Sequence, residues 1–429
     1  MRILVTGAYG FIGTQVVATL RSAQHTVVCG VRDMAQACKR FPDLELIACN
    51  FEKDVNTKIW QKRLKNIDAV VNCVGILYSR DPKVITAVHY HAPRALFEAC
   101  CNQNIKIIHI SALGADEGVG TLYAQTKFSL EKYMQTLQAN WVILRPSLVY
   151  GSGSFGGTSL FRALAALPFF IPVVGDGKQT FQPVHISDVA KTVEIVVRSV
   201  GISRKTINVV GGDKVSLEQI LCQLRNWLGF GKTKILHIPL ALIKPIAYLG
   251  NWIQDIPINM TSYKMLSYSN TADYESFIKI VEIKPRKFID SLIENPSSLQ
   301  DRWHARLYFL NPLLRLTLGL LWVLSGFIPL CISDHQESFN LLQKCGLNGI
   351  WVKLIFYGNT LLDIALGIAT LMKWKIKWIG GFQFLLISFY TIFISVLLPG
   401  YWTDPLGAVV KNIPILIATL IMLVLSESR

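Results

Sequence analysis

The spacing of apolar residues changes near residue 300 and divides the chain into two parts. Up to that point, short apolar runs alternate with amphipathic stretches. The first run, Arg2–Thr6, is followed by a glycine-rich turn and by helical spacing over residues 14–23. Further strands are predicted at residues 26–31, 67–73 and 105–110, and a helix at 92–101. This alternation predicts an α/β domain over residues 1–300, with a doubly wound parallel sheet and a small substrate-binding subdomain.

Beyond residue 300 the sequence contains four apolar segments, at about residues 312–332, 351–372, 378–398 and 409–426. Each approaches the ~20 residues that a helix needs to cross the hydrocarbon core of a bilayer. They predict a second domain over residues 301–429, an all-α four-helix transmembrane bundle. Asp363 interrupts the second segment. Three roles are compatible with this residue: a proton relay, a quinone contact and a helix–helix hydrogen bond.

Charge indicates how the domains face the membrane. The chain has a net charge of +15, with 51% hydrophobic and 17% charged residues. Arg302, Arg306 and Arg315 flank the first apolar segment, and three lysines lie between the second and third. Because Lys and Arg concentrate on the cytoplasmic side, the enzyme domain and both termini are predicted to face the cytoplasm of a bacterial-type inner membrane. Membrane lipids are therefore the expected partners of the positive charge. Nucleic acid is not, because no basic helix or zinc-knuckle spacing is present.

The nine cysteines include no CxxC pair, so we expect neither a disulfide framework nor a metal site.

The glycine-rich turn after the first strand predicts a dinucleotide site. Gly7, Gly10 and Gly13 lie between strand and helix, and Phe11 and Ile12 open the helix. The first backbone N–H groups of a helix are unpaired, and the helix dipole favours an anion, so such a turn binds a pyrophosphate.

Two further positions bear on the cofactor. Arg32 ends the second strand, where dinucleotide folds contact the adenosine ribose. An arginine there suits the 2′-phosphate of NADP(H), so NADP(H) is favoured, while the adjacent Asp33 leaves NAD(H) open. Val74 and Gly75 follow another strand, at the sheet edge that the cofactor would cross.

Ser111, Tyr123 and Lys127 are the candidate catalytic residues. Ser111 ends a strand, where α/β sheets place their chemistry. Tyr123 and Lys127 are four residues apart on a predicted helix and therefore share a face. We expect the lysine to lower the pKa of the phenol and prepare it for proton transfer to or from a substrate oxygen that Ser111 orients.

Taken in order, these motifs resemble the extended and atypical short-chain dehydrogenase/reductases, which have a Rossmann fold. Residues 144–151, 183–190 and 208–212 continue the likeness, and residues 111–115 are most similar to the branch with the nucleotide-binding accessory subunit of respiratory complex I. The resemblance implies that the three glycines hold the pyrophosphate, Tyr123 is the acid/base, Lys127 holds the ribose and Ser111 assists. It also assigns Pro146 to the cofactor site.

Three departures from that pattern favour plain hydride transfer over epimerase chemistry. The interval between Ser111 and Tyr123 is shorter than in sugar-nucleotide epimerases of the extended branch. His91 replaces an asparagine that the family often places on this helix, and Asn50-Phe51 stands where an Asp-Leu pair often touches the adenine.

The C-terminal part resembles the DoxX-like four-helix membrane family, on residues 402–407 and 411–414. The two resemblances predict a membrane-anchored NAD(P)H-dependent oxidoreductase acting on a carbonyl or quinone-like, lipid-soluble small molecule. One alternative is a non-catalytic nucleotide-binding subunit of a membrane respiratory or quinone-biosynthesis complex. The other is an NAD-dependent sugar-nucleotide epimerase or dehydratase.

Overall fold

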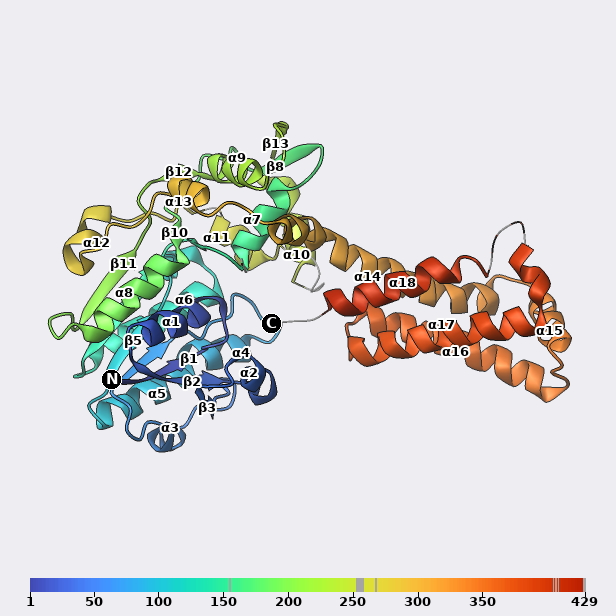
Figure 1. The fold of residues 1–429 in the computed structure, drawn as a ribbon, viewed down its shortest axis with the longest axis horizontal. Coiled ribbons are helices and arrows are strands. Elements are labelled where there is room, and N and C mark those ends of the chain that lie inside the picture. The colour runs from blue at the N-terminus through green and yellow to red at the C-terminus, as the bar shows by residue number, and fades with distance from the viewer. Residues whose placement is uncertain are drawn as a thin grey trace. The chain divides into compact units, whose positions relative to one another are not determined.

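The computed structural model describes residues 1–153, 156–251, 258–266, 268–403, 405, 407 and 409–426 (Figure 1). Two compact units are present, Met1–Arg306 and Leu307–Arg429. Part of the motif at residues 402–407, namely Asp404 and Leu406, lies outside the described residues.

The first unit is built on a seven-stranded parallel sheet in the order β11-β6-β5-β4-β1-β2-β3. Strands β1 to β3 are added toward one edge of the sheet, and β4 and the strands after it are added toward the other edge. The strand order therefore reverses between β1 and β4, and the carboxyl ends of these two strands border a crevice. The predicted doubly wound parallel sheet is confirmed. Its strands are β1 (Arg2–Thr6), β2 (Thr26–Val31), β3 (Glu45–Ala48), β4 (Ala69–Asn72), β5 (Lys106–Ile110), β6 (Trp141–Pro146) and β11 (Lys205–Val209).

Helices cover both faces of this sheet because its central strands are apolar on both sides. The buried residues accordingly form two separate cores, one on each face. One face is packed by α1 (Phe11–Ser22), α8 (Ile186–Arg198) and α12 (Tyr274–Val281). The other is packed by α3 (Thr57–Arg63), α5 (Ala92–Asn102) and α6 (Leu122–Thr136), while α2 (Met34–Arg40) and α4 (Pro82–Thr86) are short connections.

A smaller substructure follows β6 and has its own core, which includes Tyr150, Phe161 and Phe288. Three two-stranded pairs belong to it: β7 (Val149–Tyr150) with β10 (Val184–His185), β8 (Phe170–Val174) with β13 (Lys234–Ile238), and β9 (Thr180–Phe181) with β12 (Val215–Ser216). Its helices are α7 (Gly157–Ala165), α9 (Leu217–Trp227), α10 (Leu240–Leu249), α11 (Met260–Leu266) and α13 (Phe288–Glu294).

Two helices in the nucleotide-binding part begin earlier than the apolar spacing predicts. The first starts at Phe11 rather than at residue 14, because Gly10 is its N-cap and the glycine turn runs directly into it. The helix predicted at residues 92–101 continues a helical stretch that begins at Pro82 and passes through a π-helical turn, Ala87–His91. A π turn adds a residue and shifts the helical phase, which affects the site described below.

The second unit is helical. Among the described residues, three helices are long and apolar enough to cross a membrane: α14 (Leu299–Cys331, which begins in the first unit), α16 (Ile350–Leu371) and α17 (Ile376–Leu397). The fourth predicted segment forms α18 (Asn412–Leu425), which has only 14 residues. It is shorter than predicted because Pro414 lacks an N–H group and is tolerated only in the first turn of a helix. A short helix, α15 (His335–Lys344), connects α14 to α16.

Contacts between these helices fix their relative register. The Asn412 amide donates to Thr391 Oγ1, and a Cβ on Gly380 would lie 2.7 Å from the Leu423 side chain, so α17 and α18 run antiparallel. Asn311 of α14 donates to the carbonyl oxygen of Leu425. The C-terminal end of α18 therefore returns to the level at which α14 enters this unit.

Close helix packing explains three glycines at the α14–α16 crossing. A Cβ on Gly326 would lie 2.2 Å from the carbonyl oxygen of Thr360, and one on Gly367 would lie 2.6 Å from the backbone nitrogen of Val323. Gly319 approaches Leu371 in the same way. Small residues let membrane helices approach closely, as in this crossing.

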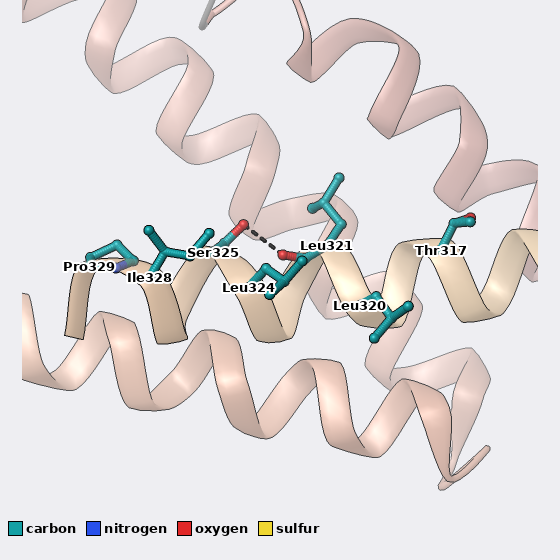
Figure 2. A pocket seen from close by; sticks show the side chains of 7 residues that line it. All are labelled: Thr317, Leu320, Leu321, Leu324, Ser325, Ile328 and Pro329. Carbon is teal, nitrogen blue, oxygen red and sulfur yellow. Dashed lines mark hydrogen bonds between the residues drawn. The ribbon is translucent and has the colours of Figure 1, made fainter. Parts of the chain in front are cut away.

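One face of α14 borders an open apolar groove of about 600 Å³ (Figure 2). Its two hydroxyl groups are already used, because Ser325 donates to the Leu321 carbonyl and Thr317 to the Leu314 carbonyl. The groove thus offers a hydrocarbon surface of the kind that lipid chains cover. All seven lining residues come from this helix: Thr317, Leu320, Leu321, Leu324, Ser325, Ile328 and Pro329.

Candidate active site

The glycine turn has the geometry that a pyrophosphate site needs. Gly7 has a φ of +70°, and a Cβ on it would lie 3.0 Å from the Val74 nitrogen. Gly13 is held tighter still, because its Cβ would lie 2.0 Å from the Gly7 carbonyl oxygen. The N-cap Gly10 has no side chain to bond the first-turn N–H groups of α1, where Phe11 and Ile12 lie. These residues fit a dinucleotide phosphate, and the close packing leaves room for the backbone alone.

A pocket of about 230 Å³ opens beside this turn, at the carboxyl ends of β1, β2, β3 and β4. It contains five of the predicted cofactor residues: Gly7, Gly10, Arg32, Val74 and Gly75. Phe11, Ile12 and Gly13 form the adjoining helix start, and Pro146 ends β6 without lining the pocket. The other lining residues are Tyr9, Gly30, Val31, Cys49, Asn50, Phe51, Glu52, Cys73, Ile76 and Val88.

Arg32 and Asp33 have different surroundings at the tip of β2. The Arg32 guanidinium lies in the pocket wall, is largely exposed, and forms a 3.1 Å ion pair with Glu52. The Asp33 carboxylate instead accepts a hydrogen bond from the Gln36 N–H and caps α2. Asp33, the residue that leaves NAD(H) binding open in the sequence, therefore already forms a structural hydrogen bond.

Tyr123 and Lys127 lie together on α6. The Lys127 ammonium lies over the Tyr123 ring, 5.7 Å from its centroid, and donates to the carbonyl oxygen of Ile110 at 3.1 Å. Lys127 is also next to the pocket, because a Cβ on Gly75 would lie 3.7 Å from its Nζ. The tyrosine–lysine pair and the nucleotide pocket therefore share a wall.

His89 connects that wall to α6. Its Nε2 accepts a hydrogen bond from the Ile76 N–H at 3.1 Å, so Nδ1 carries the proton and donates to Thr126 Oγ1 at 3.2 Å. Its ring packs edge-on against Tyr123, with 5.3 Å between centroids. His91, which stands where the family often places an asparagine, is exposed. The π turn and the apolar spacing of Ile85, Val88 and Ala92 put position 89 on the buried face.

Ser111 lies at the end of β5, where it is 4% exposed. Its Oγ is buried without a hydrogen-bond partner among the described residues, and no bond joins it to Tyr123. A buried hydroxyl that is left unpaired is available to a substrate oxygen.

A second set of buried polar side chains lies below the pocket and was not anticipated from the sequence. Asn72 Oδ1 accepts from Thr6 Oγ1 at 2.8 Å and from the Val74 N–H at 3.2 Å. The Asn72 amide nitrogen in turn contacts His109 Nδ1 at 3.2 Å. These bonds tie the end of β1 to the turn that carries Val74 and Gly75.

Burial controls the protonation of this site. It raises the pKa of Tyr123 to about 12 and lowers the pKa of Lys127 to about 8, although Glu131 favours the charged lysine. Burial, helped by the charge of Lys127, also lowers the pKa of His89 to about 3. The expectation of a phenol pKa below its ordinary value is therefore wrong for this structure. The ammonium lies over the ring and bonds Ile110, and desolvation outweighs it.

Two family models match the chain. Residues 3–210 match the NAD dependent epimerase/dehydratase family, and residues 319–420 match the DoxX-like family.

Similar individual proteins match the first of these parts. Ceramide reductase of Caulobacter vibrioides is 23% identical over 239 residues, which are 55% of this chain and 73% of that protein. The 40 kDa subunit of the mitochondrial NADH-ubiquinone oxidoreductase of Neurospora crassa is 23% identical over 251 residues. That match covers 58% of this chain and 65% of the subunit, just under two thirds of its length.

Solved structures share the fold. UDP-glucuronic acid 4-epimerase of Bacillus cereus, in complex with UDP-glucuronic acid and NAD, aligns with a TM-score of 0.53 at 20% identity. The alignment covers 71% of this chain and 99% of that one. The chain therefore joins a Rossmann domain of the NAD-dependent epimerase/dehydratase type, similar to complex I subunits, to a DoxX-like membrane domain.

Proposed function

We propose that this protein is a membrane-anchored NAD(P)H-dependent oxidoreductase that reduces a carbonyl or quinone-like oxygen of a lipid-soluble substrate. The observation that carries the proposal is the wall shared by the nucleotide pocket and the tyrosine–lysine pair. Gly75 lines the pocket, and the Lys127 ammonium lies directly behind it. A group held in this pocket and a proton on Tyr123 would thus meet on one side of the sheet.

Each residue of the pair has a role in this reaction. When bound, the reduced nicotinamide supplies the hydride. With its pKa at about 12, Tyr123 is protonated at neutral pH and can donate its hydroxyl proton to the oxygen being reduced. The unpaired Ser111 Oγ can donate a hydrogen bond to the same oxygen. Lys127 stabilises the tyrosinate that remains, because its ammonium lies over the ring.

For the cofactor, NADP(H) is the favoured form. Arg32 offers a mostly exposed guanidinium in the pocket wall, and a guanidinium binds phosphate through paired N–H groups. Asp33, the residue that would suit the 2′-hydroxyl of NAD(H), already accepts the Gln36 N–H. NAD(H) is the competing form in the titration described in the Discussion.

A lipid-soluble substrate is supported by two independent findings. The catalytic domain is fused to a unit with three helices of bilayer length. One of its relatives is named a ceramide reductase, and ceramide is a lipid. We place the enzyme domain and both termini in the cytoplasm of a bacterial-type inner membrane. The return of Leu425 to the level of Asn311 supports this orientation for the C-terminus, as do the lysines between α16 and α17.

The alternative is a nucleotide-binding subunit without catalysis, which assembles with a membrane complex. The likeness to a subunit of NADH-ubiquinone oxidoreductase favours it. The epimerase alternative has support from the fold alone, because the solved epimerase structure is only 20% identical. The catalytic and non-catalytic readings differ in the need for the Tyr123 hydroxyl, which a substitution tests.

The test compares Tyr123→Phe with Tyr133→Phe on the same helix in the full chain, reconstituted in nanodiscs. Tyr133 donates to Glu98, away from the pocket, and serves as the matched control. Loss of the acid/base should lower turnover by roughly 10²–10⁴-fold while NADPH binding persists. Turnover would be followed as NADPH oxidation with a panel of lipid-soluble ketones and quinones. Equal turnover of the two variants would refute the role of Tyr123.

A further inference from the structure

Helix α10, in the first unit, has its apolar side turned outward. Only Ile243 and Ala247 are buried, and they form a narrow stripe on one side of the helix. A neighbouring side of the helix presents Leu242, Ile246 and Leu249, which are 62%, 50% and 53% exposed. A surface helix of a globular protein normally has the reverse arrangement, with polar residues outward. Among the described residues, no segment covers this face.

The length and charge of α10 limit what can cover it. With ten residues the helix is roughly 15 Å long, about half of what a bilayer crossing needs. Tyr248, next to Leu249 in the sequence, is 62% exposed, and Lys244 of the same helix is exposed as well. Lys234 is the first residue of β13, the strand that leads into α10, and Lys232 lies two residues before it. Apolar side chains flanked by an aromatic ring and by lysines are typical of helices that lie in the interface of anionic membranes.

The rest of the chain keeps such a surface near a bilayer. The same polypeptide continues into three helices of membrane-spanning length. A tethered surface meets the membrane at a high effective concentration, so a modest apolar patch suffices for stable contact. A free partner protein has no such advantage.

We propose that α10 lies in the lipid headgroup region, with Leu242, Ile246 and Leu249 inserted among the acyl chains and the lysines at the anionic headgroups. This contact goes beyond anchoring by the spanning helices, because it fixes how the enzyme domain faces the membrane.

The neighbouring helix gives this contact a consequence for the site. α10 packs against α11. Lys264 of α11 donates to the Gly120 carbonyl, and Met265 would be 3.0 Å from a Cβ on Gly114. Both glycines lie in the loop between Ser111 and Tyr123. Docking of α10 would bring this loop close to the lipid, which is the substrate source that the proposed function requires; the docking itself does not depend on the chemistry of Tyr123.

The test places an environment-sensitive fluorescent amino acid at position 246 of the full chain in nanodiscs that contain phosphatidylglycerol. Position 200 is the matched control, because Val200 is 91% exposed and lies in a loop of the same unit. The proposal predicts that the label at 246, and not at 200, shifts its emission to the blue. It also predicts severalfold stronger quenching of that label by doxyl groups on the lipid chains.

Two outcomes would overturn the proposal. Equal emission and quenching at 246 and 200 would mean that α10 stays in water. A blue shift at 246 without quenching by doxyl lipid would mean that a protein surface, including a second copy of this chain, covers α10. A double variant, Leu242→Glu with Ile246→Glu, adds a separate readout through a label at position 249. Its quenching should fall to the level of position 200 while NADPH binding shows that the domain is folded.

Discussion

Lys127 is almost completely buried, at 4% exposure, and its ammonium bonds the Ile110 carbonyl beside the nucleotide pocket. Since burial lowers its pKa to about 8, a small rise above neutral pH removes the charge that, in the proposed reaction, stabilises tyrosinate at Tyr123. Among the residues of this site, it is the one whose titration should be visible in the rate.

We therefore predict that kcat/KM for carbonyl reduction is constant below about pH 8 and falls above it. The lysine loses its proton in this range, whereas Tyr123 keeps its proton until about pH 12. The measurement is a pH–rate profile between pH 6 and pH 10. Lys127→Arg is the control, because a guanidinium stays charged throughout, and this fall should disappear from its profile. A wild-type rate that is flat through pH 10 would contradict the assignment.

Arg32 should decide which cofactor is bound. Replacing it by glutamine removes the guanidinium from the pocket wall without changing Asp33, which remains bonded to Gln36. A hydrogen bond to a charged group contributes about 1.5–3 kcal/mol, so the Kd for NADPH should rise by roughly 10–100-fold. The Kd for NADH should change little. Titration of both cofactors into wild type and Arg32→Gln checks this, and an equal loss for NADH would remove the basis for preferring NADP(H).

At the scale of elements, the π turn Ala87–His91 brings a neutral histidine into the joint between the pocket wall and α6. His89 keeps its proton-free Nε2 for the Ile76 N–H and donates through Nδ1 to Thr126. Its pKa falls from 6.5 to about 3 in the folded protein, mainly by burial. Between these pH values the unfolded chain binds a proton that the folded chain does not, so stability decreases as the pH falls below 6.5.

This linkage predicts that His89→Gln flattens the acid loss of stability. The variant removes the titrating ring, although it also lowers stability at neutral pH because one of the two bonds is lost. His91→Gln on the same turn should leave the decline unchanged, since His91 is exposed. The check is the Tm of the three proteins in detergent between pH 7 and pH 4. Parallel declines of wild type and His89→Gln would show that this histidine does not contribute.

The same turn shows where sequence reasoning succeeds and where it stops. Apolar runs such as Arg2–Thr6 predict the sheet because a strand buried on both faces needs a continuous apolar sequence. His89 goes unnoticed in the sequence because the predicted helix starts at Ala92 and is not extended upstream, where Ile85 and Val88 reveal the buried face. The raised pKa of Tyr123 could not be foreseen either. Desolvation depends on tertiary packing, which residue spacing does not contain.

A polar side chain that holds a turn by hydrogen bonds is equally hard to recognise in the sequence. Asn72 falls within the strand predicted at residues 67–73, and nothing in the spacing indicates that its side chain bonds both Thr6 and the Val74 N–H. In the membrane part, the apolar spacing located α16 and α17 to within two residues, but it overestimated α18. The helix is shorter than its apolar sequence because Pro414 lacks an N–H group and so limits how far α18 can extend toward its N-terminus.

At the scale of the whole molecule, the proposed orientation has native probes. Cys38 lies on α2 and is exposed, and Cys331 ends α14 and is exposed as well. If α14 crosses the membrane from a cytoplasmic enzyme domain, the two thiols lie on opposite sides. A membrane-impermeant maleimide should then modify Cys331 in intact spheroplasts and Cys38 only in inverted vesicles, as peptide mass spectrometry would report. Labelling of Cys38 in intact spheroplasts would reverse the orientation.

The central claim is that hydride passes from a nicotinamide to a lipid carbonyl on this protein. The most direct measurement supplies the nanodisc-reconstituted chain with NADPH deuterated at the transferred position and with lipid-soluble ketones, and then weighs the alcohols formed. The account predicts one deuterium at the carbinol carbon, formed by wild type and Tyr133→Phe and reduced by roughly 10²–10⁴-fold in Tyr123→Phe. Tight NADPH binding without deuterium in any lipid product would contradict it and would identify a nucleotide-binding subunit without catalysis.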